Sequence, residues 1–211
     1  MKKKTIGVIG SINVDLLLNV KDLPGPGHTV HGQGGTMSPG GKGANQALAA
    51  ARQGAGVLLI GAVGNDPHAE IALSLLADAK VDLAHVKHIE EATGLAVVTV
   101  DQYGENNIVV IAGANSTVSR EAVDSALPML RRCSLVVLQG EIPVATVDHA
   151  IEMLTKSGTR IVLNLAPVIG IRPESIRKAD PLIVNEHEAV QALELLGIGP
   201  PHPTFRLGKY R

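Results

Sequence analysis

Five short apolar runs recur through this chain, and their spacing restricts the possible fold more than any other feature. Each run is bounded by turn residues and is separated from most of its neighbours by a segment with helical periodicity. The runs are Ile6–Ile9, Val57–Ile60, Leu135–Leu138, Ile161–Leu163 and Leu182–Val184. Continuous apolar runs of this length indicate strands that are buried on both faces, as in a parallel sheet.

The segments between these runs are predicted to be amphipathic helices. Apolar residues recur at three- and four-residue spacing in Pro67–Ala79, Arg120–Arg131, Val144–Lys156 and Glu186–Leu196. Strands that alternate with helices favour a layered α/β domain, in which right-handed crossovers place helices against a mostly parallel sheet.

Two regions break this alternation. Asp15–Val20 with Thr29–Gly34, and Leu95–Asp101 with Asn107–Ile111, resemble paired strands with no helix between them, and residues 102–106 predict a hairpin turn in the second pair. These segments cannot all join the parallel sheet. We therefore expect a small, separate antiparallel sheet whose edges are covered by the main domain or by a second copy of the chain.

The stretch Thr36–Gly54 is predicted to be a glycine-rich loop that runs directly into a helix. Its glycines, Gly40, Gly41 and Gly43, permit unusual backbone conformations and a close approach of a ligand to the main chain. Strong helix formers follow from Ala44 onward. A helix that begins here is expected to offer free N–H groups to an oxygen-rich ligand.

Two side chains, Lys42 and Asn45, add hydrogen-bond donors at the start of this helix. The stretch is not a Walker A loop, because Thr36 stands where that motif needs glycine and Gly43 stands where it needs serine or threonine. A purely structural role for the loop and helix is the alternative interpretation.

Composition excludes several classes of partner. The net charge is −1, with one Phe, two Tyr and no Trp in 211 residues, which argues against a nucleic-acid or membrane-surface partner. The lone cysteine, Cys133, cannot form an internal disulfide and is typical of a reducing compartment. We therefore expect a cytoplasmic protein.

Polar or small residues follow each apolar run. They are Gly10, Ser11, Asn13 and Asp15; Gly61, Gly64 and Asp66; Gly140 and Glu141; Asn164; and Asn185, Glu186 and Glu188. Because the carboxyl ends of parallel strands share one edge of a sheet, these residues predict a polar rim suited to a polyhydroxylated ligand. Each also has an alternative role as a turn residue or helix cap, which we favour for Asp66 and Asn164.

Six motifs occur in a fixed order between the N-terminus and about Leu196. They are Gly10–Asp15 (GSINVD), Leu23–Val30 (LPGPGHTV), Gly40–Ala47 (GGKGANQA), Gly113–Asn115 (GAN), Gln139–Pro143 (QGEIP) and Asn185–Ala189 (NEHEA). Their order and composition resemble the ribokinase-like, or PfkB, family of carbohydrate kinases. The GGKGANQ run is the most specific of them.

The resemblance implies a three-layer αβα domain over residues 1–196, with a small β lid formed by segments near 15–34 and 95–111. It also implies an enzyme that transfers the γ-phosphoryl group of ATP, with Mg²⁺, to a primary hydroxyl of a pentose, with D-ribose and its 5-phosphate as the expected pair. In relatives the lid also supports dimerisation, so a homodimer is expected.

The resemblance further implies roles for single residues. By matched position, the sugar site comprises Asn13, Asp15, Gly41, Lys42, Gly43, Asn45 and Glu141. An ionised aspartate suits a sugar because it accepts hydrogen bonds from hydroxyl groups. Asn185 is expected near the nucleotide phosphates and Glu188 near the magnesium, although a helix N-cap and a first-turn glutamate explain both without a ligand.

The sequence departs from the family pattern in its last part. The family's Gly-Ala-Gly-Asp signature, which supplies an anion hole and the catalytic aspartate, does not occur; the similar letters Gly54-Ala55-Gly56 are followed by Val57. Residues 197–211 carry clustered prolines and no strand pattern, so we expect an atypical tail outside the fold. These features predict a C-terminally truncated kinase that lacks a catalytic residue.

Two alternatives to a working kinase stay open from the sequence. One is a sugar-binding remnant or pseudokinase that keeps the pentose site without phosphoryl transfer. The other is a dinucleotide-binding domain, which is weakly supported because no G-x-G-x-x-G follows the first apolar run.

Overall fold

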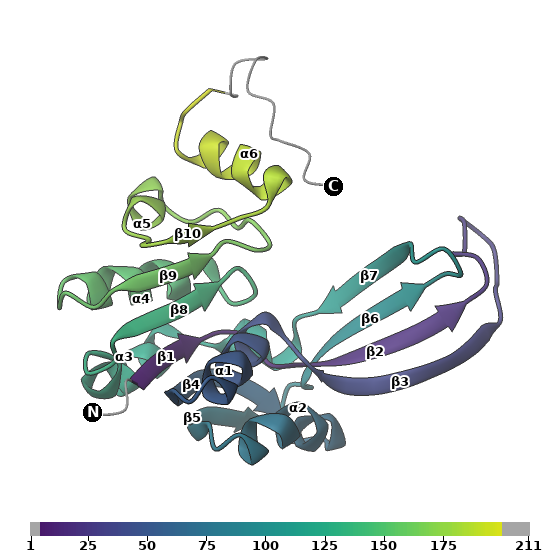
Figure 1. Cartoon of the computed structure of the whole chain (residues 1–211), viewed down its shortest axis with the longest axis horizontal. Coiled ribbons are helices and arrows are strands. Elements are labelled where there is room, and N and C mark those ends of the chain that lie inside the picture. The colour runs from purple at the N-terminus through teal and green to yellow at the C-terminus, as the bar shows by residue number, and fades with distance from the viewer. Residues whose placement is uncertain (1–4, 200–211) are drawn as a thin grey trace.

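A six-stranded parallel sheet forms the centre of the computed structural model, which describes residues 5–199 (Figure 1). Its strands are β1 (Thr5–Ile9), β4 (Gly56–Gly64), β5 (Asp82–Ile89), β8 (Leu135–Gln139), β9 (Ile161–Asn164) and β10 (Leu182–Ile183). They pair in parallel in the order β10-β9-β8-β1-β4-β5. All five predicted runs lie in this sheet. The predicted tail falls at residues 197–211, of which 200–211 lie outside the described residues.

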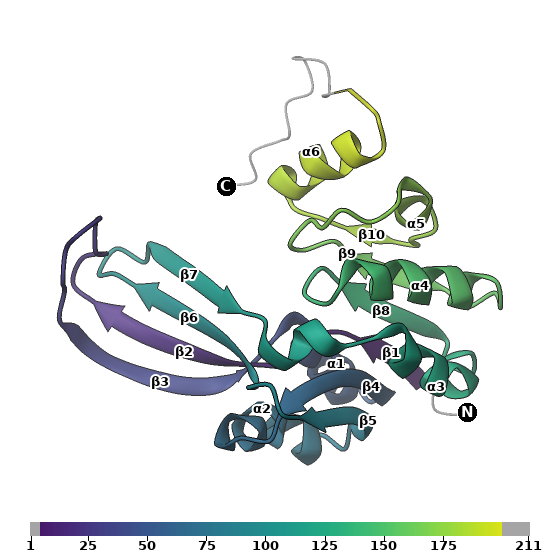
Figure 2. The same ribbon diagram turned by 180° about the vertical axis from the view of Figure 1, so that it is seen from behind.

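Helices cover both faces of the sheet, as the periodicity predicts. They are α1 (Lys42–Arg52), α2 (Pro67–Asp78), η1 (Gly113–Thr117), α3 (Arg120–Leu130), α4 (Val144–Thr155), α5 (Pro173–Arg177) and α6 (Glu186–Leu195). Helices α1 and α2 lie on one face of the sheet, and α3 and α4 lie on the other (Figures 1 and 2). Neighbouring strand residues point to opposite faces, so Val8 packs in a cluster with α1 and α2, whereas Ile9 packs in a cluster with α3 and α4. The three-layer α/β prediction is confirmed. No described helix is long and apolar enough to cross a membrane.

A second sheet of four strands extends away from the main domain, and we call it the lid (Figure 1). It comprises β2 (Asn13–Val20), β3 (Gly32–Gly40), β6 (Gly94–Val100) and β7 (Asn106–Ile111), in the order β3-β2-β6-β7. The β2–β3 and β6–β7 pairs are antiparallel, whereas the central β2–β6 pair is parallel. The separate small sheet and its hairpin therefore exist as expected, with one parallel pairing at the centre.

The predicted loop at Thr36–Gly40 is wrong, because these residues form the end of β3 rather than a loop. Glycine and proline are poor strand formers, so the sequence favoured a loop here and a strand at Thr29–Gly34 instead. Pairing with the complete length of β2, from Asn13 opposite Gly40 onward, overrides that local preference. The lid thus reaches directly to the start of α1.

Strand β5 was not predicted at all. It lies at the edge of the main sheet and pairs only with β4. Several of its side chains, including His85, Lys87 and His88, are polar, as is common on strand edges that must not pair with other chains. Its sequence therefore lacks the continuous apolar run that identifies the other five strands of this sheet.

The start of α1 is pressed against the bend between β1 and β2. A Cβ atom added at Gly43 would lie 2.6 Å from the carbonyl carbon of Gly10 and 2.7 Å from the nitrogen of Ser11. Both neighbours are backbone atoms, which cannot rotate away. Only glycine allows α1 to approach β1 this closely.

We therefore predict that Gly43→Ala lowers the free energy of unfolding by about 1–3 kcal/mol or more, through overpacking against backbone. Urea denaturation followed by circular dichroism measures this. Gly170→Ala is the control, because a Cβ there meets no atom within 4 Å. Equal stability of the two variants would contradict the close packing described for α1.

Candidate functional site

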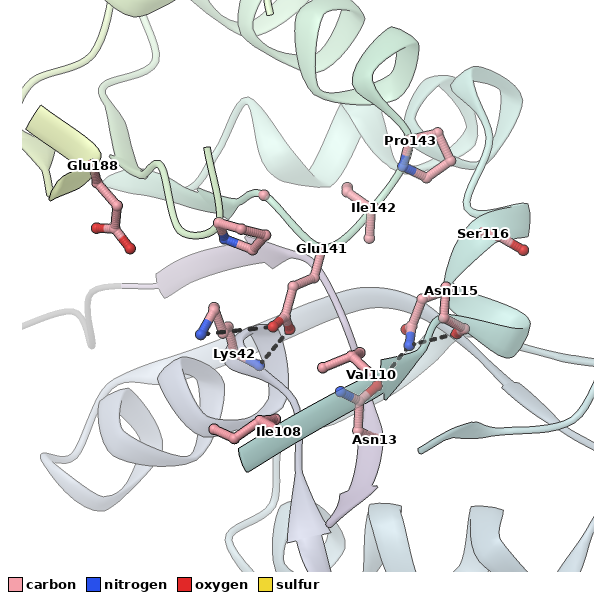
Figure 3. Close-up of a pocket in the computed structure, with 13 residues that line it drawn as sticks. Asn13, Lys42, Ile108, Val110, Asn115, Ser116, Glu141, Ile142, Pro143 and Glu188 are labelled. Carbon is pink, nitrogen blue, oxygen red and sulfur yellow. Dashed lines mark hydrogen bonds and ion pairs between the residues drawn. The ribbon is translucent and has the colours of Figure 1, made fainter. Parts of the chain in front are cut away.

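A cavity of about 620 Å³ lies where the lid meets the carboxyl edge of the main sheet (Figure 3). The residues that line it are Asn13, Lys42, Ile108, Val110, Ala112, Asn115, Ser116, Gly140, Glu141, Ile142, Pro143, Pro167 and Glu188. Apolar side chains from β7 and from the loop after β8 face polar ones from β2, α1 and η1. Such a mixture is typical of small-molecule sites, in which few polar groups fix the orientation of a ligand.

Glu141 joins three separate elements in this cavity. Its carboxylate accepts hydrogen bonds from Ser11 Oγ at 2.5 Å and from the backbone N–H of Lys42 at 3.2 Å. The ammonium group of Lys42 lies 3.6 Å from Glu141 Oε1, and both side chains are only partly exposed (Figure 3). The loop after β8, the bend after β1 and the start of α1 are thereby held together.

The N-terminus of α1 does not offer the free N–H groups that we predicted from the sequence. Lys42 N–H donates to Glu141, Gly43 N–H donates to Ser11 Oγ at 3.3 Å, and Ala44 N–H donates to the Ser11 carbonyl at 2.9 Å. A carboxylate at this position is favourable because the helix dipole is positive there. At the start of α1, the cavity is thus lined by the Lys42 side chain and its partner Glu141 from the loop after β8.

Asn13 is held by a buried asparagine from η1. Asn115 donates through Nδ2 to Asn13 Oδ1 at 2.7 Å and accepts from Ile12 N–H through Oδ1 at 2.8 Å. The same Nδ2 also lies within hydrogen-bond distance of the carbonyls of Ile12 and Ala112. With its oxygen occupied by Asn115, Asn13 lines the cavity with amide N–H groups that are able to donate.

Asp15 lies two residues beyond Asn13 on β2. Its carboxylate packs so closely over Gly40 that a Cβ atom added to Gly40 would overlap it. Burial raises the pKa of Asp15 above its ordinary value, the carboxylate of Glu141 acts in the same direction, and Lys42 opposes both. Asp15 is not among the residues that line the cavity, and its link to the site is this electrostatic influence of Glu141 and Lys42.

Asn185 and Glu188 form a capping box at the start of α6. Asn185 Oδ1 accepts from Glu188 N–H, and Glu188 Oε2 accepts from Asn185 N–H, both at 2.8 Å. Glu188 lines the cavity, whereas Asn185 is not among its lining residues. The capping role that the sequence suggested for both is therefore present, and the ligand roles stay predictions.

Four further sequence-predicted residues, Gly41, Gly43, Asn45 and Asp66, do not line the cavity. Gly41, with a φ of 91°, and Gly43 shape the backbone at the base of α1 rather than line the cavity. Asn45 is exposed, and its backbone N–H donates to the Gly41 carbonyl. Asp66 caps α2 by accepting from Ala69 N–H, as favoured above.

The sequence placed Ser11 in the polar rim and Asn115 in the GAN motif, but it did not predict that either holds other site residues in place. Both are almost completely buried polar residues that hold predicted site residues in place. Each lies inside a motif that was noted, the GSINVD and GAN stretches, so the signal was present. Their partners are about a hundred or more positions away in the chain, and local patterns do not reveal such contacts.

The raised pKa of Asp15 leads to a prediction about stability. A carboxyl whose pKa rises on folding binds its proton more tightly in the folded state, so stability falls as pH rises from 3.8 through the raised value. We expect Asp15→Asn to raise the urea midpoint at neutral pH, with a gain that shrinks as the pH falls toward 3.8. Glu90→Gln, on an exposed side chain, should show no such trend. A lower midpoint for Asp15→Asn at every pH would contradict the electrostatic description.

Comparisons with known proteins agree with this geometry. Residues 3–200 match the pfkB family carbohydrate kinase domain. The chain is 36% identical over 188 residues to a ribokinase of Haemophilus influenzae, covering 89% of this chain and 61% of that protein. It is 37% identical to a deoxyribokinase of Salmonella typhi, covering 95% of this chain and 64% of the relative. The chain thus spans somewhat less than two thirds of these relatives.

Solved structures show the same architecture. A ribokinase of Arabidopsis thaliana complexed with ribose and ATP superposes with a TM-score of 0.80 at 29% identity, covering 95% of this chain and 65% of that one. The family match extends over nearly the complete chain, from before β1 to beyond α6. This chain therefore belongs to the pfkB family of carbohydrate kinases.

Proposed function

We propose that this chain carries the acceptor site of a kinase that phosphorylates a primary hydroxyl of a pentose, with D-ribose yielding ribose 5-phosphate. The observation that carries the proposal is the grouping of Asn13, Lys42 and Glu141 around one cavity, with Asp15 electrostatically coupled to the last two. Two carboxylates accept from sugar hydroxyls, while the asparagine amide and the ammonium group donate. The relatives named ribokinase support this choice of sugar.

ATP is the proposed phosphoryl donor, placed on the α6 side of the cavity. The solved relative with ribose and ATP supports this, and Asn185 lies at the start of the helix that would face the phosphates. Glu188 has one carboxylate oxygen left beside its capping bond, which fits Mg²⁺ because this ion is commonly held by one or two carboxylates plus phosphate oxygens. The metal would neutralise charge on the transferred group. We place the protein in the cytoplasm.

Pentose binding is the first test. We expect calorimetry to show weak binding of D-ribose without ATP, because the proposed sugar residues all lie before the last part of the chain. Asp15→Ala should weaken it about 10- to 100-fold, the cost of losing hydrogen bonds to a charged acceptor. Glu90→Ala is a matched control that removes an exposed carboxylate. Equal affinity of Asp15→Ala and the unaltered chain would place the pocket elsewhere.

Catalytic turnover is expected to be negligible for the 211-residue chain by itself. Its sequence has no Gly-Ala-Gly-Asp; Gly54 instead ends α1 with a φ of 89°, and Gly56 begins β4. Lack of a general base typically lowers the reaction rate about a hundred- to ten-thousand-fold. Lack of oxyanion donors lowers it about a hundred- to thousand-fold, and because both act on one transition state the two losses need not multiply.

A coupled assay with ribose, ATP and Mg²⁺ measures this turnover. Turnover of about one per second or more, lost in Asp15→Ala, would show that other residues supply the catalytic machinery. A chain that binds ribose without turnover is also what the second candidate function predicts, a sugar-binding remnant or pseudokinase. Fusion to the C-terminal third of a relative separates the two: restored turnover supports a kinase acceptor domain, and inactivity supports the remnant.

A homodimer through the lid is our last proposal for this function. Strand β7 exposes apolar side chains on both faces: Ile108 and Val110 line the cavity, whereas Val109 and Ile111 lie on the opposite face and are 62% and 54% exposed. Exposed apolar area of this kind is typical of a protein interface.

Sedimentation velocity at micromolar concentration should therefore show a dimer. Val109→Lys should shift it toward monomer, while Tyr103→Lys in the exposed turn should not. A purely monomeric unaltered chain would contradict the proposal.

A further inference from the structure

Three side-chain amides form a continuous chain of hydrogen bonds at the carboxyl edge of the main sheet. Gln139 Nε2 donates to Gln46 Oε1 at 2.6 Å, and Gln46 Nε2 donates to Asn164 Oδ1 at 3.2 Å. Asn164 Nδ2 in turn donates to the carbonyl of Ile183 at 3.2 Å. We call Gln139, Gln46 and Asn164 the amide relay. None of the three lines the cavity.

The last acceptor fixes the direction of the complete relay. A backbone carbonyl can only accept, so Asn164 must turn its amide nitrogen toward Ile183 and its oxygen toward Gln46. Gln46 then donates to Asn164 and accepts from Gln139. The chain of donors therefore runs one way, from β8 through α1 to β9 and β10.

At the start of the relay, Gln139 carries a buried oxygen that stability alone does not explain. Gln139 is completely buried, and its Oε1 has no hydrogen-bond partner in the described part of the chain. Gln139 Oε1 packs so closely against Gly10 that a Cβ atom added to Gly10 would overlap this oxygen. A buried acceptor without a partner lowers stability, and an apolar residue at this position would avoid that loss. That an amide nevertheless occupies this position indicates that its nitrogen, the donor to Gln46, is needed.

The residues of the relay are close in sequence to residues on both sides of the site. Gln46 is one helical turn after Lys42, and Gln139 is two residues before Glu141. Ile183 is two residues before Asn185, the cap of α6. In the sheet, Gln139 pairs with Asn164 and Asn164 pairs with Ile183, so the relay crosses three adjacent strand ends at one level (Figure 1).

We propose that Gln46, with Gln139 and Asn164, is a positioning residue that holds the Lys42–Glu141 side of the site in register with the Asn185–Glu188 side. Within residues 5–199, the bond from Gln46 to Asn164 is the only side-chain hydrogen bond that joins α1 to β9 or β10. The inference rests on the proposed function for the ligand that this register serves. The relay itself would touch neither sugar nor nucleotide.

The test compares Gln46→Met, which keeps the length of the side chain and removes both bonds, with Ser175→Ala. The control removes a hydrogen bond of 2.5 Å from Ser175 Oγ to Asp148 on the other face of the sheet. Without ligand, we expect the backbone amides of Lys42 and Gly43 to exchange with solvent about tenfold faster in Gln46→Met than in the control. Gln46→Glu, which can accept from Gln139 but cannot donate to Asn164, should behave like Gln46→Met.

Asn164→Ala breaks the relay at a partly exposed position and serves if Gln46→Met does not fold. The proposal would be overturned if, in the folded relay variants, the backbone amides of Lys42 and Gly43 exchanged at the same rate as in the Ser175→Ala control. Calorimetry with D-ribose adds a second measure, with an expected loss of about tenfold in affinity for Gln46→Met and none for Ser175→Ala. If the unaltered chain does not bind ribose, the proposed sugar fails, and the exchange comparison still decides on the relay.

Discussion

The carboxylate of Glu141 at the start of α1 is the interaction on which the arrangement of the site depends. It accepts from Ser11 and from the backbone of Lys42, and it lies beside the Lys42 ammonium group. Hydrogen bonds from several donors stabilise a carboxylate that is partly withdrawn from water, and the positive end of a helix supplies some of these donors. The same contact joins β1, α1 and β8, three elements that are separated by up to 130 positions in the chain.

The connections between the main domain and the lid are held by a small number of buried or half-buried polar groups. Asn115 links the bend before β2 to the end of β7, since it bonds Ile12, Asn13 and Ala112. Asp66 and Thr93 make an equivalent link on the other side, because Asp66 accepts from Thr93 and Thr93 accepts from Gly64. Buried networks with satisfied partners favour one geometry over alternatives. The position of the lid above the cavity therefore depends on side chains outside the lid sheet.

Most of the fold could be predicted because burial leaves a clear pattern in the sequence. Five apolar runs identified five of the six strands of the main sheet, and helical periodicity identified four of the helices. The pattern failed where a residue's surroundings override its local preference. Strand β3 contains five glycines or prolines in nine residues and still forms, because β2 offers a complete row of hydrogen-bonding groups. Strand β5 was missed because an edge strand carries polar side chains.

For the candidate site, the sequence by itself determined which chemical groups are available: two carboxylates, one ammonium group and several amides, each placed after a strand or at the start of α1. The tertiary structure decided what those groups do. It directed the first N–H groups of α1 to Glu141 and Ser11 rather than to a ligand, raised the pKa of Asp15 by burial beside Glu141, and aligned Gln46 with Gln139 and Asn164. Hydrogen bonding and desolvation depend on distances between atoms, and residues far apart in a chain acquire those distances only when the sheet has formed.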